Sequence, residues 1–522
     1  MKLNTQNPNN YGYKTQYLDI RILGGLKLGK LESLRVTLSI QKIGSMNILR
    51  HSIDLYNDNQ VEKFVRRIAE RLEIGTSVVR QCLRELTREL ENYRFILLES
   101  EKQQQSGPEI PPLTGKATQE ATAFLKKEHL LANTNEYIGR SGVIGEETSR
   151  LLMYLLFTSR KTNNPLHCIS LGSSGVGKTH LQSKVAELIP QEDKVEITVL
   201  SANAFYYFNR TELKNKLILI EDLDGAESVL YPLRELQSKK RITKTVVHKD
   251  SKGTTKTIHL TVEGPVSVAG CTTRESVYED NSNRSFLLYM DESSEQDKKI
   301  MDYQRAISAG KVNEEEQLAA VALLRNTQKI LKPVKVINPF AEFLELPQSV
   351  FKPRRTNSHY LQLIEAITFY HQYQREEQVN EATGEVYIET TIEDIQEANH
   401  LITEVLLRKS DTLSGAARNH LEKLKLYLQE KKQTQFTNAE IRRNLRIKAS
   451  TLKRYHLQLI EEGYIKKISG KKGQIYHYQI IDVKEYQHLK EQISKALEDC
   501  LTKINRPTGS VVAHQPNGPV NK

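Results

Sequence analysis

An apolar run, a glycine-rich loop and a helical pattern follow one another between residues 166 and 190. LHCISL has the composition of a buried strand, GSSGVGKT is the loop, and the helical pattern ends before Pro190. Apolar strand patterns recur in KLILIED (216–222) and GPVSVAGCTT (264–273), separated by helical or hairpin segments. This alternation predicts an α/β fold with a parallel sheet flanked by helices.

The glycine-rich loop matches the pattern G-x-x-x-x-G-K-[ST]. Its glycines let backbone N–H groups converge on phosphate oxygens, at which the positive end of the following helix also points. The lysine of this pattern reaches the β- and γ-phosphates, and the hydroxyl ligates magnesium. The loop therefore predicts a site for ATP and Mg²⁺; the alternative is a glycine-rich turn that matches by chance. The residues of the predicted cradle are Gly172, Ser173, Ser174, Gly175, Val176, Gly177, Lys178 and Thr179.

Acidic residues follow the next apolar strand, where a P-loop ATPase needs them. Glu221 and Asp222 end the run LILIED, and Asp224 comes two residues later. By position, we expect Glu221 on the magnesium side as a metal ligand and Asp222 to polarise the attacking water. The usual order in this motif is Asp then Glu, so Asp224 is a second candidate. The alternative is a strand end whose acids are simply solvated.

Residues at three further places in the sequence fit the polar contacts of an AAA+ ATPase. Thr272 and Thr273 end the next strand, where a sensor-one residue contacts the γ-phosphate or the attacking water; strand-end hydrogen bonds are the alternative. Arg284 precedes another strand, as an arginine finger acting on a neighbouring subunit's ATP does; a surface salt bridge is the alternative. Arg355, or Arg354 beside it, opens a helix as a weaker sensor-two candidate.

A basic hairpin is predicted between the acidic strand and the sensor strand. Residues 241–248 and 255–262 alternate like strands, and Gly253 is available for the turn. In ring helicases resembling the minichromosome maintenance and superfamily III groups, a hairpin at this point projects into the pore and grips DNA. The alternative is a charged edge hairpin without a ligand. The lysines of the predicted hairpin are Lys244, Lys249, Lys252 and Lys256.

The segment 432–482 has the rhythm of a winged helix. FTNAEIRRNL predicts a first helix, KASTLKRYHLQLIEEGYI a second with Ser450 as its N-cap, and KKISGKKGQIYHYQI a β-wing. We expect the second helix to face the major groove and the wing tip to meet phosphate, although such modules also dock proteins. The expected DNA-binding residues are Thr451, Lys453, Arg454, Lys471 and Lys472.

These motifs divide the chain into segments of different composition. The fold class we predict is an AAA+ P-loop core with a helical lid, a small N-terminal α/β module and a C-terminal winged helix. The predicted boundaries are 1–100 for the N-terminal module, 101–116 for a linker, 117–340 for the ATPase core, 341–431 for the lid and connector, 432–482 for the winged helix and 483–522 for a helix and disordered tail.

Charge and composition limit the partners and the compartment. The formal charge of +11 favours a polyanionic partner, of which nucleic acid is the usual one; a merely solvated basic surface is the alternative. The four cysteines form neither a CxxC motif nor a Cys/His cluster, so structural zinc and disulfides are not expected. No apolar run is long enough to span a bilayer, and the first residues lack the apolar core of a signal peptide. We therefore expect a cytoplasmic protein without a membrane partner.

Several motifs occur in a fixed order and carry a family resemblance. They are YLDIRILGGLKLGKLESLRVTLSI, GVIGEETSRLLMYLLFTSRK, GSSGVGKT, FYYFNRTELKNKLILIEDLDGAE, LRELQS, VEGPVSVAGCTT, NRSFLLYMDES and HYLQLIEAITFYHQYQRE. In this order they resemble a bacterial mobile-element family of long primase-like proteins, which have an N-terminal zinc finger, a Toprim catalytic domain and a C-terminal AAA+ ATPase. The resemblance runs from about residue 17 to residue 482.

The chain departs from that family in its primase half. It has no Cys/His zinc cluster and no Toprim-like strand glutamate followed by a DxD pair before the ATPase. We therefore expect no primase activity from this chain, and a separate polypeptide as a possible primase partner. The resemblance implies an ATP-dependent DNA motor, a helicase or helicase loader for a mobile element, whose subunits form a homo-oligomeric ring. The alternative is an ATP-controlled DNA-binding switch or adaptor that does not translocate.

Overall fold

A computed structural model describes residues 3–5, 7, 9–26, 33–105, 113–198, 203–225, 230–249, 255–273, 283–469, 475–481 and 484–505. The chain divides into two compact units, residues 1–112 and 113–522. Each unit has a hydrophobic core of its own, and each is described by itself. No helix among these residues is long and apolar enough to cross a membrane.

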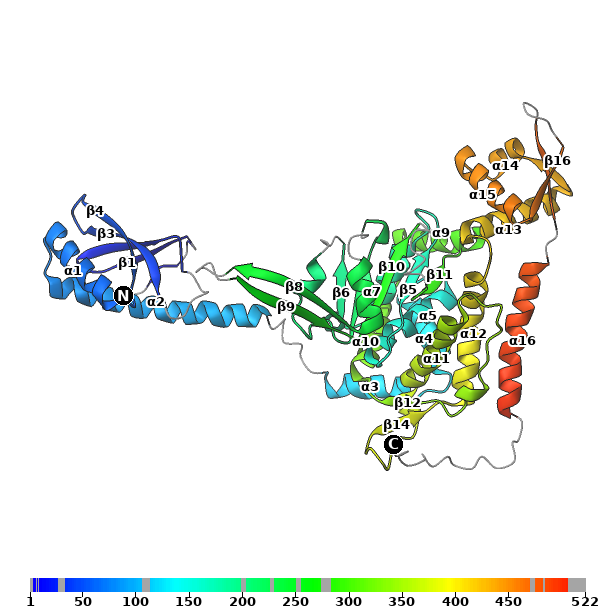
Figure 1. The fold of residues 1–522 in the computed structure, drawn as a ribbon, viewed down its shortest axis with the longest axis horizontal. Helices are drawn as coiled ribbons and strands as arrows, with labels where there is room; N and C mark the ends of the chain where they lie inside the picture. Colours follow the sequence, from blue (N-terminus) through cyan, green and yellow to red (C-terminus); the bar gives the residue numbers. More distant parts are fainter. Residues whose placement is uncertain are drawn as a thin grey trace. The chain divides into compact units, whose positions relative to one another are not determined.

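The N-terminal unit is a four-stranded antiparallel sheet followed by two helices (Figure 1). Its elements in order are β1 (Asn10–Lys14), β2 (Leu18–Leu23), β3 (Arg35–Lys42), β4 (Ile48–Asp54), α1 (Asp58–Leu72) and α2 (Thr76–Gln105). Alternate strand residues point to one face, where they pack on Phe64, Val65 and Ile68 of α1. Strands and helices are thus both present in this segment, as expected of an α/β module.

The predicted linker at 101–116 is shorter than expected. Helix α2 continues through residue 105, and α3 begins at Gly115. The reason is local: LLESEKQQQ contains good helix formers and neither glycine nor proline, so nothing in it stops the helix. Of the predicted linker, residues 106–112 lie outside the described residues.

The second unit contains the predicted parallel sheet. Its strands are β5 (Cys168–Leu171), β6 (Lys194–Ile197), β7 (Lys216–Ile220), β10 (Val266–Thr272) and β11 (Phe286–Tyr289). Their spatial order is β11-β5-β10-β7-β6, and every neighbouring pair is parallel. The strand that ends in the predicted sensor threonine therefore lies directly between the P-loop strand and the acidic strand. Strand β6 was not predicted, because KVEI is short and mostly polar.

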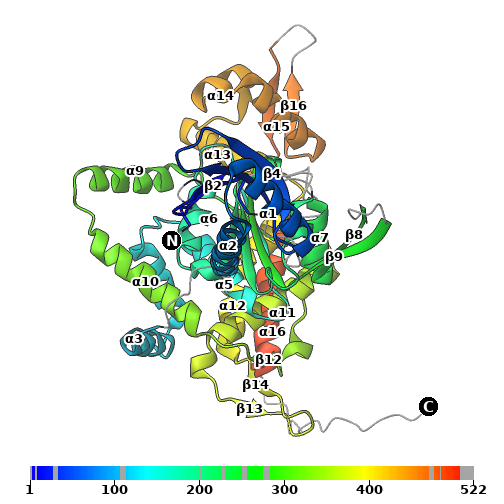
Figure 2. The ribbon, with the colours of Figure 1, turned by 90° about the vertical axis from the view of Figure 1, so that its left-hand side faces the viewer.

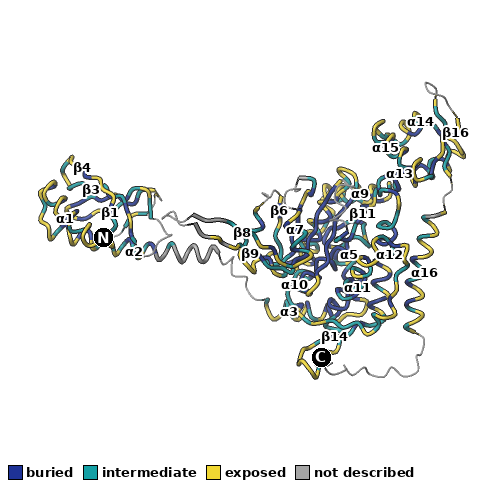
Figure 3. Tube along the Cα trace, viewed as in Figure 1, coloured by how far each residue is buried: buried dark blue, intermediate teal, exposed yellow. Residues whose placement is uncertain are grey.

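Both faces of this sheet are buried, which explains its nearly continuous apolar strands. Cys168, Leu217 and Leu219 enter a core of helices on one face, whereas Ile169, Ile218 and Ile220 enter a smaller core on the other. The dark tube in Figure 3 follows these strands and the neighbouring helix α5 (Glu147–Thr158). The smaller core is completed by α7 (Leu230–Lys239) and the base of the hairpin β8 (Arg241–Lys249) and β9 (Thr255–Glu263).

Helices cover the larger core. They include α3 (Gly115–Leu125), α4 (Leu130–Arg140), α6 (Lys178–Ala186) and α10 (Glu314–Ile330). Helix α10 packs on α3 and α4, and Figure 2 shows it beside α3. Helix α9 (Ser294–Ser308) is mostly exposed and buries Gln296. Short 3-10 turns connect the elements: η1 (Ser159–Lys161), η2 (Gln191–Asp193), η3 (Ala204–Tyr207), η4 (Leu223–Gly225), η6 (Ala341–Phe343) and η7 (Gln372–Gln374). Arg160 anchors the layer from within, because its fully buried guanidinium donates to Gln328 at 2.7 Å and to Asp193 at 2.5 Å.

The segment predicted as a helical lid is not a helical body apart from the core. Helices α11 (Pro353–Tyr370) and α12 (Ile392–Lys409) share the larger core with α5, and α16 (Glu485–Asn505) packs along α12 (Figure 1). A small sheet packs against α11, and sequence periodicity missed it because its strands have only two to four residues. Its strands are β12 (Lys335–Ile337), β13 (Gln378–Val379) and β14 (Val386–Glu389).

The second unit has a third core, which forms around residues 413–480. It joins α13 (Gly415–Lys431), α14 (Asn438–Asn444) and α15 (Ala449–Glu461) to a three-stranded antiparallel sheet. The strands of this sheet are β15 (Gln435–Thr437), β16 (Ile465–Ser469) and β17 (His477–Ile480). Two expectations change: α13 belongs to this core rather than to a lid, and Ser450 lies inside α15, whose N-cap is Lys448.

A buried ion pair closes this third core. Both Arg418 and Asp411 have side chains that are 2% exposed, and the guanidinium donates to the two carboxylate oxygens at 2.6 and 2.7 Å. It also donates to the Tyr464 hydroxyl at 2.9 Å and lies 3.9 Å from the ring centre of Tyr486 in the following segment. A second acid, Glu422, lies 3.8 Å from the same guanidinium but is half exposed.

We predict that Asp411→Ala selectively loosens this core, because it leaves a buried guanidinium without its carboxylate. The expected loss of local stability is about 3 kcal/mol, which corresponds to roughly 100-fold faster hydrogen exchange in α13. Glu422→Ala is the matched control, since an exposed pair contributes about 1 kcal/mol or less. Exchange mass spectrometry resolves the two, and equal effects of the two variants would contradict the buried-pair argument.

Candidate nucleotide site

The carboxyl ends of β5, β7 and β10 meet around one cavity of about 530 Å³. Because these strands are parallel, the loops that follow them lie at the same edge of the sheet. Residues more than 90 positions apart in sequence therefore share the cavity. The residues that line it are Ser174, Gly175, Gly177, Lys178, Thr179, His180, Glu221, Asp222, Asp224, Cys271, Thr272 and Thr273.

The loop after β5 has the backbone conformation that a phosphate cradle needs. Gly175 and Gly177 have φ angles of 86° and 97°, in the left-handed region that side chains disfavour. Gly177 is the N-cap of α6, so the positive end of that helix opens onto the cavity. A Cβ atom at Gly172 would lie 2.9 Å from Val176 Cγ1, so the first glycine of the motif permits a close packing of the loop.

Lys178 is held over this loop. Its side chain is buried, and its ammonium group donates to the carbonyl oxygens of Gly172 and Ser173 at 2.9 and 2.8 Å. Among the residues that the structure describes, no carboxylate pairs with it. A cation whose contacts are neutral carbonyls keeps its full attraction for a phosphate group.

Not every predicted member of the cradle reaches the cavity. The structure brings Ser174, Gly175, Gly177, Lys178 and Thr179 to it, whereas Gly172, Ser173 and Val176 are not among its lining residues. The Ser173 amide and hydroxyl both donate to Glu292 Oε1 at 2.9 Å, so this acid from the segment after β11 fixes the start of the loop. The sequence pattern gave no sign of the Glu292 contact, since 119 positions separate the two residues.

The three candidate acids are arranged unequally. Glu221 and Asp222 are exposed at the mouth of the cavity. Asp224 instead accepts hydrogen bonds from the hydroxyls of Thr272 at 2.6 Å and Thr273 at 3.0 Å. Its own amide donates to Asp222 Oδ1 at 2.8 Å, which orients that carboxylate. Asp224 thus joins the ends of β7 and β10, and the Thr272 hydroxyl contacts this acid.

Two buried residues that the sequence did not single out complete the floor of the site. Gln182 of α6 donates to the Ile220 carbonyl at 3.3 Å and accepts from the Cys271 thiol at 3.4 Å. Burial raises the pKa of Cys271 to about 11, so the thiol stays protonated and acts as this donor. These contacts fix the P-loop helix to both strands that carry the acids and threonines.

The residues present fit ATP and magnesium. Turn glycines, the N-terminus of α6 and the Lys178 ammonium provide donors for phosphate, while the Thr179 hydroxyl and the Glu221 and Asp222 carboxylates are oxygen ligands of the kind magnesium takes. Thr179 and Glu221 would hold the ion. When bound, magnesium neutralises charge on the phosphate oxygens.

A second group of residues, with three cations and one histidine, lies at the opposite, amino edge of the sheet. Lys240, Arg284, Arg355 and His359, which we call the amino-edge cluster, line a cavity of about 280 Å³ next to His167, the residue before β5. No aspartate or glutamate is among the described residues that line this cavity. The Arg284 Nε atom donates to Ser238 Oγ at 2.9 Å. The cluster is therefore cationic and faces away from the chain's own P-loop.

The pKa values of two buried groups in and beside the amino-edge cluster reflect the positive charge there. Burial and the nearby charge of Arg355 lower the pKa of Lys409 to about 8. Burial and the charges of Lys409, His167 and Arg355 lower the pKa of His359 to about 3, so this imidazole is neutral. An anion in the cavity would relieve this repulsion.

The sensor-two candidate Arg355 lies apart from the P-loop cavity. It lines the cavity at the amino edge together with Arg284, so the structure does not bring it to the cradle of its own chain. The reason is the packing of α11 on α5 within the larger core, which places the start of α11 beside residues 164–167. Arg284 precedes β11, as predicted.

The expected DNA-facing residues are only partly described. Lys453 and Arg454 are exposed on α15, near exposed Arg442 and Arg443 of α14. Lys249 ends β8, and its side chain lies outside the described part, as do Lys252, Lys471 and Lys472 altogether. The hairpin strands match the predicted ranges closely.

Residues 114–333 match a family model described as the MTBMA_p00010 P-loop domain. This part of the chain is a P-loop domain. The match covers less than half of the 522 residues and includes the cradle, both strand-end groups and Arg284. No curated protein matches the chain.

Solved structures that resemble the chain do so weakly. A full-length MCM homolog from Methanopyrus kandleri is 15% identical with a TM-score of 0.37, over 57% of this chain and 63% of that one, less than two thirds of its length. Drosophila ORC bound to DNA is 12% identical with a TM-score of 0.20, over 75% and 95%. The C-terminal region of NrS-1 is 13% identical with a TM-score of 0.20, over 72% and 77%. Such scores do not establish a shared fold.

We predict that Lys178→Ala abolishes ATP hydrolysis, because it removes the charge that faces the phosphates. Asp222→Asn should preserve ATP binding and lower turnover by about 100-fold or more, since the cradle stays intact while the polarising carboxylate is lost. Lys184→Ala, which removes another lysine of α6, is the control with parental turnover. Phosphate release and binding of a fluorescent ATP analogue measure both effects. Parental turnover in either site variant would refute the assignment.

Proposed function

We propose that this chain is an ATPase of the AAA+ type that acts as a DNA motor, a helicase or helicase loader of a mobile element. ATP hydrolysis would take place at the carboxyl edge of the sheet and would be completed by a neighbouring copy of the chain. The observation that carries the proposal is the separation of the chain's own P-loop cavity from its amino-edge cluster.

The P-loop cavity lacks a group that a fast ATPase uses. No arginine is among the described residues that line it, whereas two arginines line the cavity at the other edge. A transition state for phosphoryl transfer carries charge that a guanidinium stabilises. Copies arranged in a ring, carboxyl edge to amino edge, would bring Arg284 of one chain to the ATP of the next. Arg355 and Lys240 would enter the same contact.

Asp224 gives the site a means of responding to nucleotide. It links the acidic strand to Thr272 at the end of β10, and Asp222 is oriented by the Asp224 amide. Any change of charge at the cavity would act on this network of hydrogen bonds. Only Gly264 and Pro265 separate the end of β9 from the start of β10, so the hairpin is attached directly to the strand that carries Thr272.

This connection supports a mechanical role for the hairpin. Its base is buried through Ile242 and Val262 in the smaller core, and the Gly264 and Glu263 amides donate to the carbonyls of Lys240 and Arg210 at 2.7 Å. Lys249 and Lys252 would contact DNA phosphates at its far end. Movement of β10 with the nucleotide state would move this end.

The third core supports a separate DNA anchor. Its helices α14 and α15 and the hairpin β16–β17 have the order of a winged helix, and Lys453 and Arg454 are exposed on the second helix. We assign these residues to DNA, with Lys471 and Lys472 of the wing as further phosphate contacts. Primase activity is not part of the proposal, and a separate polypeptide would supply it.

We predict that Arg284→Ala lowers ATP hydrolysis roughly 10³-fold while ATP binding survives. Mixing this variant with Lys178→Ala should restore part of the activity, because each chain supplies what its neighbour lacks at a shared interface. Phosphate release from the mixture is the measurement. Arg305→Ala, an arginine of α9 that pairs with Asp302, is the control and should behave like the parent. Absence of rescue at every mixing ratio would contradict a site completed between copies.

A strand-displacement assay with the purified chain separates motor from switch. A motor should unwind a forked duplex in ATP, and the Lys178→Ala variant should not. ATP-dependent DNA binding without unwinding under any condition would instead favour the switch, in which ATP drives assembly alone.

A further inference from the structure

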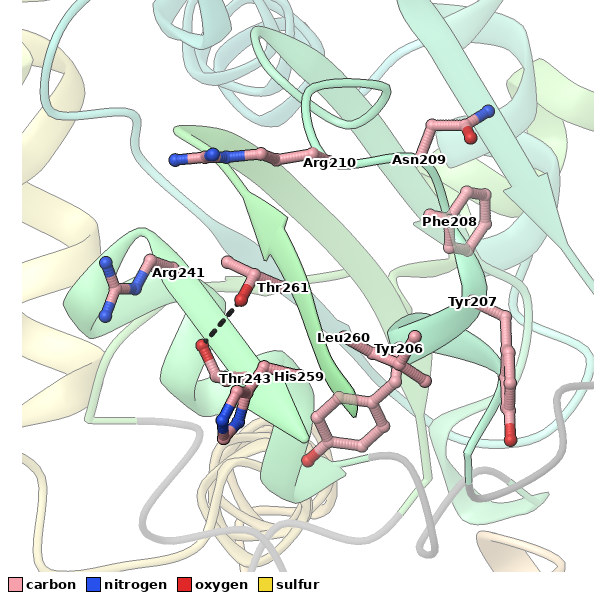
Figure 4. Close-up of a pocket in the computed structure, with 10 residues that line it drawn as sticks. All are labelled: Tyr206, Tyr207, Phe208, Asn209, Arg210, Arg241, Thr243, His259, Leu260 and Thr261. Carbon is pink, nitrogen blue, oxygen red and sulfur yellow. Dashed lines mark hydrogen bonds between the residues drawn. The ribbon is translucent and has the colours of Figure 1, made fainter. Parts of the chain in front are cut away.

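A hollow of about 690 Å³ lies at the base of the hairpin, away from the nucleotide cavity. Figure 4 shows its lining: η3 and the residues after it contribute aromatic side chains and Arg210, while the hairpin contributes Arg241 and His259. We call it the aromatic hollow. None of the P-loop cavity residues belongs to it.

The aromatic side chains are held on a rigid base but remain accessible. Phe205 is fully buried in the smaller core and anchors η3, and its ring lies 6.1 Å from that of Phe208. The side chain of Tyr207 is 69% exposed, so its large apolar ring has no place in the core. In the view of Figure 4, the ring of Tyr206 lies between those of His259 and Tyr207. Flat rings are thus gathered at one solvent-facing site.

The charged side chains that line the hollow are positive. Arg241 and Arg210 line the hollow, and no aspartate or glutamate is among its described lining residues. Arg210 pairs with Glu263 at 2.7 Å but remains 71% exposed, so its guanidinium is still accessible. Lys244 stands beside the hollow, 5.6 Å from the ring centre of Tyr206, and donates to Asn203 at 2.8 Å.

Exposed aromatic rings beside arginines match the chemistry of an unpaired nucleic-acid strand. Unpaired bases offer flat faces that stack on aromatic side chains, and the phosphates between them pair with guanidinium groups. Duplex DNA fits poorly, because its bases already stack on one another. An acidic peptide would use the cations but leave the exposed tyrosine face without a partner.

We propose that the aromatic hollow binds single-stranded DNA, with Tyr207 stacking on a base and Arg241 contacting a phosphate. This inference rests on the proposed function and deepens it, because it names the unpaired strand as the form of DNA at the hairpin. The hollow lies at the start of β8 and the end of β9, so a strand bound there is held at the base of the proposed moving element.

The test is equilibrium binding of the full chain to two labelled probes without ATP. One is an oligothymidylate of about 12 nucleotides, and the other is an abasic strand of the same length. The parent should prefer the oligothymidylate. Tyr207→Leu should weaken its binding about tenfold and leave the abasic strand unaffected, while Tyr207→Phe stays within about twofold of the parent. Arg241→Ala should weaken both probes and reduce the salt slope by about 0.7.

Tyr17→Leu is the matched control, because Tyr17 is a half-exposed tyrosine of the N-terminal unit. Thermal unfolding checks that each variant is folded. Equal affinity of the parent for the two probes, or equal effects of Tyr207→Leu and Tyr17→Leu, would overturn the inference. So would a Tyr207 dependence for a duplex of the same length.

The outcomes also separate this inference from the proposed function. If the chain hydrolyses ATP and shows the Arg284 rescue described above, but shows no Tyr207-dependent binding, the inference about the aromatic hollow is wrong and the proposed function stands. If the chain binds the oligothymidylate through Tyr207, but neither hydrolyses ATP nor shows rescue, the inference about the aromatic hollow stands and the proposed motor function is wrong.

Discussion

The parallel alignment of β5, β7, β10 and β11 is the constraint on which the rest of the structure depends. Parallel strands bring every following loop to one edge of the sheet and every preceding residue to the other. The P-loop, the acids and the threonines therefore gather at the carboxyl edge, while Arg284 and Arg355 gather at the amino edge. Under the proposed function, these two groups would be complementary halves of an ATPase site, which the chain's own sheet keeps apart.

The hydrogen bonds of Asp224 would couple the charge in the nucleotide cavity to the position of β10. Its carboxylate connects β7 to β10, and Gln182 and Cys271 connect α6 to the same two strands. A change of charge in the cavity would therefore act on β10. The hairpin is attached to the opposite end of this strand. The buried base of the hairpin and the fixed η3 beside it would convert small shifts of β10 into motion of the far end of the hairpin, which we propose contacts DNA.

Much of this arrangement was predictable from local patterns. The P-loop, the strands around it and the hairpin each have a short-range signature of glycines, apolar runs or alternation, and the structure confirms their ranges closely. Contacts between distant segments left no such signature: Glu292 at the loop, Asp224 with the threonines, and Arg355 beside Arg284. Strand order and helix packing decide these contacts, so the sequence alone did not place Arg355 at the amino edge. Sequence reasoning also took Ser450 for an N-cap, a position that Lys448 occupies.

The central claim is that hydrolysis needs two copies of the chain. Its most direct test is the ATPase activity per molecule across a wide dilution series, in saturating ATP and magnesium. A site shared between copies predicts that activity per molecule falls on dilution, in step with dissociation seen by sedimentation. Activity per molecule that stays constant down to concentrations at which the chain sediments as a monomer would contradict the account.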